Sequence, residues 1–493
     1  MDRMESPQCG GKIGISRKDI TPPVGMYHRM WGAAKHDRST SVHKPLLLTA
    51  MWIEANKSTH LANLVLAMDH CILDGEEIKN IRAKVSTATQ VAPQDIEICL
   101  SHTHGSGWMS RSRSELPGGE RIGPYLDELA RICAEASVEA RGNCKPAWIT
   151  FGTGTCHLAR HRDYLDKKSK SFVCGFNPQG FADSTLLVGR IDGEDGKCIG
   201  TVVNYACHPT TLAWENTSIS PDYIGSFREL VEEQTGAPCI FLQGASGDLG
   251  PREGFVGDHA TADRNGRKLG YATLATIEDI PPAKTRFVYK GPVISGAILG
   301  TWHDEPISEH EIAARRQMIS EELKLDFPYR PDLPSLSDTK AQKAHWEAEE
   351  AKAISIGDHL QARDARALVE QMTRQITRLS VLPPGKTFPH KTKIFIWGET
   401  IWIFAQGELY QSIQMTLRQR FPEYAVVVVT VANDWQPGYL PEASTYGYGI
   451  YQEKIATLAA GSLEILSESL FRKISGILGK KSPRLDFVNP GRG

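Results

Sequence analysis

The stretch IEICLSHTHGSG, residues 96–107, joins an apolar run to two closely spaced histidines. The apolar run predicts a short buried β-strand over Ile96 to Leu100. His102 and His104 stand just past the end of that strand, and Gly105 lets the backbone turn tightly beside them. Because neutral imidazole is the commonest protein ligand for transition metals, the stretch predicts a strand that delivers candidate metal ligands to one rim of a sheet.

Ligand-type residues also follow other apolar runs. They are His208 after residues 201–207, Glu408 after residues 400–407, and Tyr439 after residues 425–432 and a short polar turn. Pro209 restricts the backbone of His208 and favours the end of a strand there. Glu408 stands where a strand is expected to give way to a helix, whose N-terminus favours negative charge. Taken singly, the three can be a core histidine, a first-turn helix acid and a loop aromatic; together they fit a catalytic metal site.

The pattern along the chain predicts an α/β fold with mixed β-sheets flanked by helices, a metal site at strand ends, and a helical insertion. Apolar runs alternate with segments whose apolar residues recur every three or four positions, which is typical of that class. We expect strands over residues 61–68, 96–100, 186–191, 199–206 and 238–242, and helices over residues 123–140 and 223–235.

Residues 305–385 differ in composition from the rest of the chain. Glu, Lys, Arg, Gln and Ala are dense from Ser308 to Leu323 and from Asp338 to Leu379, which predicts solvated helices. We interpret them as a helical insertion or lid within a single domain spanning residues 11–478. After it we expect strands over 393–404, with a hairpin at Gly398-Glu399, and over 425–432, then a last helix over 455–478 and a frayed polar tail over 479–493.

Composition excludes several functional classes. The 493 residues are 41% hydrophobic and 23% charged, with Lys+Arg 56 against Asp+Glu 58. The charges are balanced, and the sequence lacks the basic stripe of nucleic-acid-binding proteins.

No apolar run approaches the roughly 20 residues that a membrane helix requires. The N-terminus lacks the apolar segment of a signal peptide. The ten cysteines form no Cys-x-x-Cys pair, so we interpret them as free thiols of a cytoplasmic protein. Oligomeric state stays open.

Two further segments allow alternative interpretations. Residues 243–251, QGASGDLGP, form a glycine-rich loop after a predicted strand. The loop is neither a hydrolase nucleophile elbow nor a phosphate-binding loop, so it is either a tight turn or a source of backbone N–H groups for a pocket. Residues 160–163, RHRD, are either a charged surface loop or the source of a guanidinium that holds a substrate oxygen.

The ordered set of motifs resembles the N-terminal catalytic domain of the neutral/alkaline, non-lysosomal ceramidase family. The resemblance spans roughly residues 11 to 470. The motifs are GISRKDITPP at 14–23, SHTH at 101–104, NYACHPT at 204–210, GASGDLGP at 244–251, Gly407-Glu408, Gly438-Tyr439 and Tyr451.

The resemblance implies a zinc hydrolase and assigns roles by position. His102, His208, Glu408 and Tyr439 correspond to the metal ligands, and His104 to the histidine that transfers a proton or binds substrate. Tyr451 corresponds to a second active-site tyrosine. Arg160, with Arg162 as the second choice, corresponds to an arginine that contacts substrate. The ion is expected to be Zn²⁺, although a His, Glu and Tyr donor set also suits other divalent metals.

The sequence departs from the family at the position of its essential serine. Gly250 stands there, and Ser246 lies nearby in another register. We expect Arg162, Ser246 and Gly250 to lie beside the substrate. Since the glycine opens room, we expect a substrate other than ceramide. The chain also ends without room for the C-terminal immunoglobulin-like domain of the long ceramidases.

The sequence therefore favours a metal-dependent hydrolase that uses metal-activated water on a carbonyl group of a small molecule, most simply an amide. His104 would pass a proton to the leaving group, and Tyr451 with Arg160 would stabilise the oxyanion. Two alternatives stay open. One is an esterase, lactonase or lyase that acts on a sugar-derived substrate with the same metal site. The other is a non-catalytic relative that binds a ligand.

Overall fold

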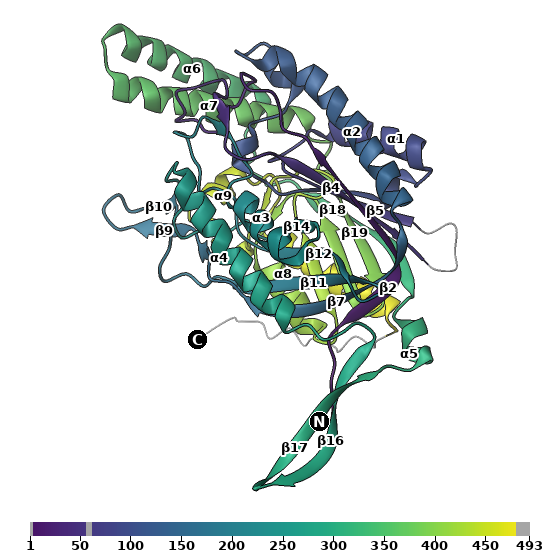
Figure 1. Cartoon of the computed structure of the whole chain (residues 1–493). Coiled ribbons are helices and arrows are strands. Elements are labelled where there is room, and N and C mark those ends of the chain that lie inside the picture. Colours follow the sequence, from purple (N-terminus) through teal and green to yellow (C-terminus); the bar gives the residue numbers. More distant parts are fainter. Residues whose placement is uncertain (1–2, 56–61, 480–493) are drawn as a thin grey trace.

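The computed structural model describes residues 3–55 and 62–479, and two packed β-sheets form its centre (Figure 1). The larger sheet has the strand order β14-β12-β11-β7-β2-β4-β5-β6, and the smaller has the order β18-β19-β20-β22. The strands of the larger sheet are β2 (Gln8–Asp19), β4 (Leu47–Glu54), β5 (Ala62–Met68), β6 (Ile96–Leu100), β7 (Lys145–Thr155), β11 (Thr185–Gly193), β12 (Cys198–Tyr205) and β14 (Cys239–Gln243). Those of the smaller sheet are β18 (Met318–Pro328), β19 (Thr387–Trp397), β20 (Thr400–Ala405) and β22 (Ala425–Val429).

Side-chain alternation along the strands creates four layers. In β4, Met51 and Ile53 face the smaller sheet, whereas Ala50 and Trp52 face the helices, because successive residues of a strand point to opposite faces. The helices over the larger sheet are α1 (Gly75–Thr89), α2 (Ile122–Gly142), α3 (Tyr223–Thr235) and α4 (His259–Glu278). Those over the smaller sheet are α8 (Ser412–Arg420) and α10 (Ser462–Ile477). The α/β class with mixed sheets is confirmed.

The chain leaving β22 ties the two sheets together at one end. The Thr430 amide donates to the Gln243 carbonyl, 3.0 Å away, at the end of β14, and the Asn433 amide donates to the Ile98 carbonyl, 2.7 Å away, in β6. Ala432 forms a bridge with Cys99 of β6. These contacts bring the carboxyl ends of β6, β14 and β22 to the same rim.

A pair of helices is inserted, in sequence, between two strands that are neighbours in the smaller sheet. The helices α6 (Leu336–Ser355) and α7 (His359–Val381) follow β18 and precede β19, and they pack on each other at one end of the molecule (Figure 1). At the opposite end, the hairpin of β16 (Thr285–Ser295) and β17 (Ala297–Pro306) projects from the body.

Two predicted helices were wrong in part. Over 308–323, the helix α5 (Glu309–Ala314) is short and Met318–Leu323 belongs to β18. The charged residues that suggested a helix suit an edge strand, where charge discourages pairing with another chain. The predicted last helix over 455–478 begins later than expected, as α10 at Ser462, directly after Gly461 with φ 92°. Ile455 ends a separate short helix, α9 (Tyr451–Ile455). The predicted hairpin at Gly398-Glu399 is confirmed, between β19 and β20.

The remaining strands are short. They are β1 (Arg3–Met4), β3 (Ser41–Val42), β8 (Ala159–His161), β9 (Asp163–Asp166), β10 (Ser171–Cys174), β13 (Ser218–Ile219), β15 (Leu249–Pro251), β21 (Glu408–Leu409) and β23 (Tyr439–Leu440). All ten cysteines are free, as expected. None of the helices within the described ranges has the length and apolar character needed to cross a bilayer. From Lys480 on, the predicted polar tail lies outside the described residues.

Candidate functional site

The four predicted metal ligands converge on the rim where the strands end. His102 follows β6, His208 follows β12, and Glu408 and Tyr439 each begin a short strand. Those two strands, β21 and β23, pair in parallel with Glu408 opposite Tyr439. The backbone register therefore places the carboxylate and the phenol side by side, although they are 31 positions apart in the sequence.

Backbone carbonyls orient both histidines. His102 Nδ1 donates to the Cys71 carbonyl, 2.8 Å away, and His208 Nδ1 donates to the Ser246 carbonyl, 2.7 Å away. Their Nε2 atoms lie 3.3 and 3.1 Å from the same oxygen, Glu408 Oε2. The three ligand atoms lie within 4.8 Å of one another. A carbonyl acceptor at Nδ1 leaves Nε2 as the coordinating atom, which is how proteins hold metal-binding histidines.

The charges of this cluster suit a cation. Burial acts to raise the pKa of Glu408, but His102 and His208 hold it well below its usual range. Burial, then the nearby Arg162, lowers the pKa of His208 to about 4, so its ring is neutral. Burial opposes protonation of His102, yet Cys71 and Glu408 raise its pKa well above the usual value. A cation bound beside Glu408 would displace that proton, because metal and proton compete for the same lone pair.

Tyr439 completes the cluster and connects it to Arg162. The Tyr439 hydroxyl lies 3.4 Å from His208 Nε2 and accepts a hydrogen bond of 2.9 Å from Arg162 Nη2. Arg162 is only 3% exposed and also donates to the Gly247 carbonyl at 2.6 Å. Its Nε has no partner within the described chain. Tyr439 is therefore held in place, and Arg162 retains a free donor.

His104 is buried beside the cluster without a hydrogen bond of its own. Both its ring nitrogens lack partners among the described residues, and its ring centroid lies 5.0 Å from that of Trp31. Burial, followed by the electrostatic effects of His102 and His208, lowers the pKa of His104 well below its usual value. His102 has φ 63°, a conformation that non-glycine residues adopt at a cost. That turn separates the directions of the two rings, which meet edge-on at 5.1 Å.

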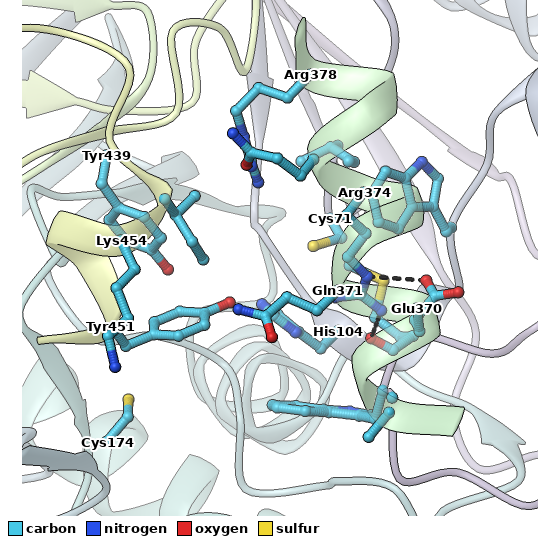
Figure 2. A pocket seen from close by; sticks show the side chains of 18 of the residues that line it. Cys71, His104, Cys174, Glu370, Gln371, Arg374, Arg378, Tyr439, Tyr451 and Lys454 are labelled. Atoms are coloured by element: carbon cyan, nitrogen blue, oxygen red, sulfur yellow. Dashed lines mark hydrogen bonds and ion pairs between the residues drawn. The ribbon is translucent and has the colours of Figure 1, made fainter. Parts of the chain in front are cut away.

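A cavity of about 590 Å³ opens onto the cluster. Its apolar wall includes Met30, Trp31, Ile72, Trp108, Trp214, Phe255 and Trp435. Tyr451 is 42% exposed, with its ring 5.9 Å from that of Tyr439. Figure 2 shows Tyr439, Tyr451 and Lys454 on one side of the cavity and α7 on the other. A pocket of this size and composition suits a small molecule.

Three predicted residues lie off the cavity wall. Arg160 pairs with Gly250 between β8 and β15, and its Nη1 donates to the Ala159 carbonyl at 3.0 Å. Ser246 is buried behind His208, where its hydroxyl accepts from Gln243 Nε2 at 2.7 Å. The arginine that the structure places at the cluster is Arg162. A Cβ added at Gly250 would approach only Thr210 Oγ1 at 3.8 Å and Arg162 Cδ at 3.9 Å, so there is room beside it.

Sequence reasoning missed the contribution of α7. Glu370, Arg374 and Arg378 line the cavity, and their four-residue spacing places them on one helix face. Glu370 accepts from Arg113 at 3.0 and 3.1 Å and from Arg374 at 2.9 Å. The spacing was visible in the sequence, but nothing there indicated which face of the helix meets the cavity.

No protein-family model and no curated protein sequence matches this chain. Two solved structures resemble it. A ceramidase complexed with C2 aligns at a TM-score of 0.66 with 14% identity, and neutral ceramidase from Pseudomonas aeruginosa aligns at 0.63 with 13% identity. Each alignment covers 98% of this chain and 77% of the other. The chain has the fold of the neutral ceramidases. At this identity the likeness concerns the fold alone, so the activity has to be argued from the geometry of the site.

Proposed function

We propose that the protein is a metal-dependent hydrolase that cleaves an amide bond of a small molecule. The observation that carries the proposal is the pair of histidines whose Nδ1 atoms are fixed by carbonyls while both Nε2 atoms meet Glu408 Oε2. Such second-partner hydrogen bonds are typical of metal-binding histidines.

The donor set fits a catalytic ion. His102, His208, Glu408 and Tyr439 would hold it, and the cavity leaves room for substrate beside them. Nitrogen and oxygen donors in this number suit Zn²⁺, and the same set accepts Mn²⁺ or Fe²⁺. When bound, the ion supplies Lewis-acid activation of water and of the substrate carbonyl.

The chain's own groups supply proton transfer and charge stabilisation. His104 is neutral and has both ring nitrogens free, so it can accept a proton and deliver it to the leaving amine. Arg162 offers its unpaired Nε to the oxygen on which charge develops, and Tyr451 is placed to offer a second donor. One such donor contributes roughly 3–4 kcal/mol to the barrier reduction.

The proposed setting is a cytoplasmic enzyme. Ten free cysteines suit a reducing compartment. Ceramide hydrolysis is not part of the proposal, since Gly250 stands at the position of the ceramidase family's essential serine.

Product analysis in ¹⁸O-labelled water tests the reaction type. The purified protein, supplied with zinc, is incubated with a panel of N-acyl compounds, matched esters and uronic-acid oligomers, and the products are analysed by mass spectrometry. The proposal expects ¹⁸O in the released acid and an equimolar amine. An unsaturated product without ¹⁸O would assign a lyase instead. Turnover of the whole panel that is unchanged in His104→Ala and Glu408→Gln would reject this site as the catalytic one.

A further inference from the structure

Arg378 is a buried guanidinium in the cavity wall that lacks an acidic partner. It is 7% exposed. It donates to the neutral Gln375 side chain, and its Nε has no hydrogen-bond partner. Glu370 on the same helix is already bound by Arg113 and Arg374. Across the described ranges, no ion pair includes Arg378. A buried charge without a counter-charge is costly, so its presence in the cavity wall points to an anionic ligand.

The guanidinium extends from α7 towards the segment that carries Tyr439 of the metal cluster. Figure 2 shows Arg378 on α7, facing the side of the cavity that carries Tyr439 and Tyr451. Gly438 directly precedes Tyr439 in the chain. A Cβ added at Gly438 would lie 3.8 Å from Arg378 Nε, so the guanidinium lies close to the backbone beside Tyr439. Burial lowers the pKa of Arg378 to about 10, with Tyr451 and Glu408 opposing the shift, so the side chain stays charged at neutral pH.

Positive charge dominates the cavity as a whole. Its basic lining residues are Arg162, Arg374, Arg378 and Lys454, and its acidic ones are Glu370 and Glu408. Glu370 also neutralises Arg113 from behind the wall, and Glu408 is engaged by His102 and His208. A bound divalent ion adds two further positive charges. A neutral substrate would leave this excess uncompensated.

We infer that Arg378 binds a carboxylate of the substrate, so that the preferred substrate is an anionic N-acyl compound and not a neutral lipid amide. The inference rests on the proposed hydrolase activity. A guanidinium offers planar, parallel N–H donors that match the two oxygens of a carboxylate. The unpaired Nε of Arg378 is one of these donors. The tryptophans of the cavity wall would pack against the acyl group. Hydrolysis adds one water, breaks the C–N bond, and releases a carboxylate and an amine that takes up a proton.

Matched probe pairs test this inference with and without turnover. N-benzoylglycine and N-benzoylglycinamide differ only in the carboxylate, as do D-glucuronate and D-glucose on a sugar frame. Binding is followed by quenching of intrinsic tryptophan fluorescence, since Trp31, Trp108, Trp214 and Trp435 line the cavity. Hydrolysis of the first pair is followed separately. A charge-assisted hydrogen bond corresponds to a preference of about 10- to 100-fold for the carboxylate.

Substitution of Arg378 assigns the preference to this residue. Arg378→Gln should reduce the preference to near unity, and Arg378→Lys should keep part of it. Arg366→Gln is the control, because Arg366 lies on the same helix but pairs with Asp37 outside the cavity lining. Circular dichroism verifies that each variant is folded.

The outcomes separate this inference from the proposed function. Equal binding and hydrolysis of N-benzoylglycine and its amide by the wild type would overturn the inference and leave the hydrolase intact. An Arg378-dependent preference in binding without any hydrolysis would support the carboxylate site and count against the hydrolase. A preference confined to the sugar acid would keep Arg378 as a carboxylate site and overturn the N-acyl assignment.

Discussion

The two walls of the cavity hold their charged groups in opposite ways. On the sheet wall, which carries His102, His208, Glu408, Tyr439 and Arg162, hydrogen bonds to the backbone or to each other orient every group. On the helix wall, which carries Glu370, Arg374 and Arg378, the Arg378 guanidinium donates only to a side chain of its own helix, Gln375, and within the described chain contacts neither the backbone nor the other wall by a hydrogen bond. In the function proposed above, the strand ends position the catalytic groups, and α7 supplies the charge that selects the substrate.

The largest effect is expected from Glu408→Gln. The amide keeps the shape but removes the charge that draws both histidines, so metal binding and hydrolysis should fall to background. Metal content and turnover are measured together. Glu399→Gln is the matched control, since Glu399 pairs with Arg315 at the other end of the smaller sheet. Full activity in Glu408→Gln would show that the sheet wall does not take part in catalysis.

The second-largest effect is expected at Arg162, which follows β8, and not at Arg160, which lies within that strand. Arg162→Gln should lower kcat by roughly 10²- to 10³-fold, the loss typical of one oxyanion donor. Arg160→Gln should leave kcat nearly unchanged, because that side chain bonds to the Ala159 carbonyl away from the cavity. Steady-state kinetics on both variants decides the point. The reverse order of effects would restore the sequence-based preference for Arg160.

Sequence patterns predicted the sheet wall well and the helix wall poorly. His102, His208, Glu408 and Tyr439 each follow an apolar run, and strand ends meet at a rim for general geometric reasons. Their convergence also depends on the chain after β22, where Thr430 and Asn433 bond to two other strands, and no local pattern reveals such contacts. The face that α7 turns to the cavity is likewise set by tertiary packing.

On the helix wall, removal of the Glu370 charge is expected to lower the stability of the fold more than the catalytic rate. Glu370→Gln leaves Arg113 and Arg374 without their shared carboxylate in a buried site. The free energy of unfolding should therefore fall by about 3–5 kcal/mol, while kcat changes little. Urea denaturation measures the loss. Glu347→Gln, which removes an exposed pair with Lys343 on α6, should cost at most about 1 kcal/mol. Equal losses would show that α7 is not anchored through Glu370.

The smallest effect is expected at Gly250. An added Cβ there meets only ordinary contacts, so Gly250→Ser should change stability by no more than about 0.5 kcal/mol. Gly247→Ser is the contrasting variant, because its Cβ would lie 2.8 Å from Tyr410 Cδ1 and 2.9 Å from the Glu408 carbonyl. Thermal unfolding of the two variants compares them. A large loss in Gly250→Ser would show that the room beside Arg162 is needed by the fold.

The metal content of the protein tests the central claim most directly. Elemental analysis is carried out on the wild type and on His208→Ala, each purified without added metal and again after zinc is supplied. The account predicts about one ion per chain in the wild type, as for a single catalytic site, and its loss in the variant. Absence of bound metal in both proteins, even after zinc is supplied, would contradict the account and leave a ligand-binding protein on a ceramidase-like fold.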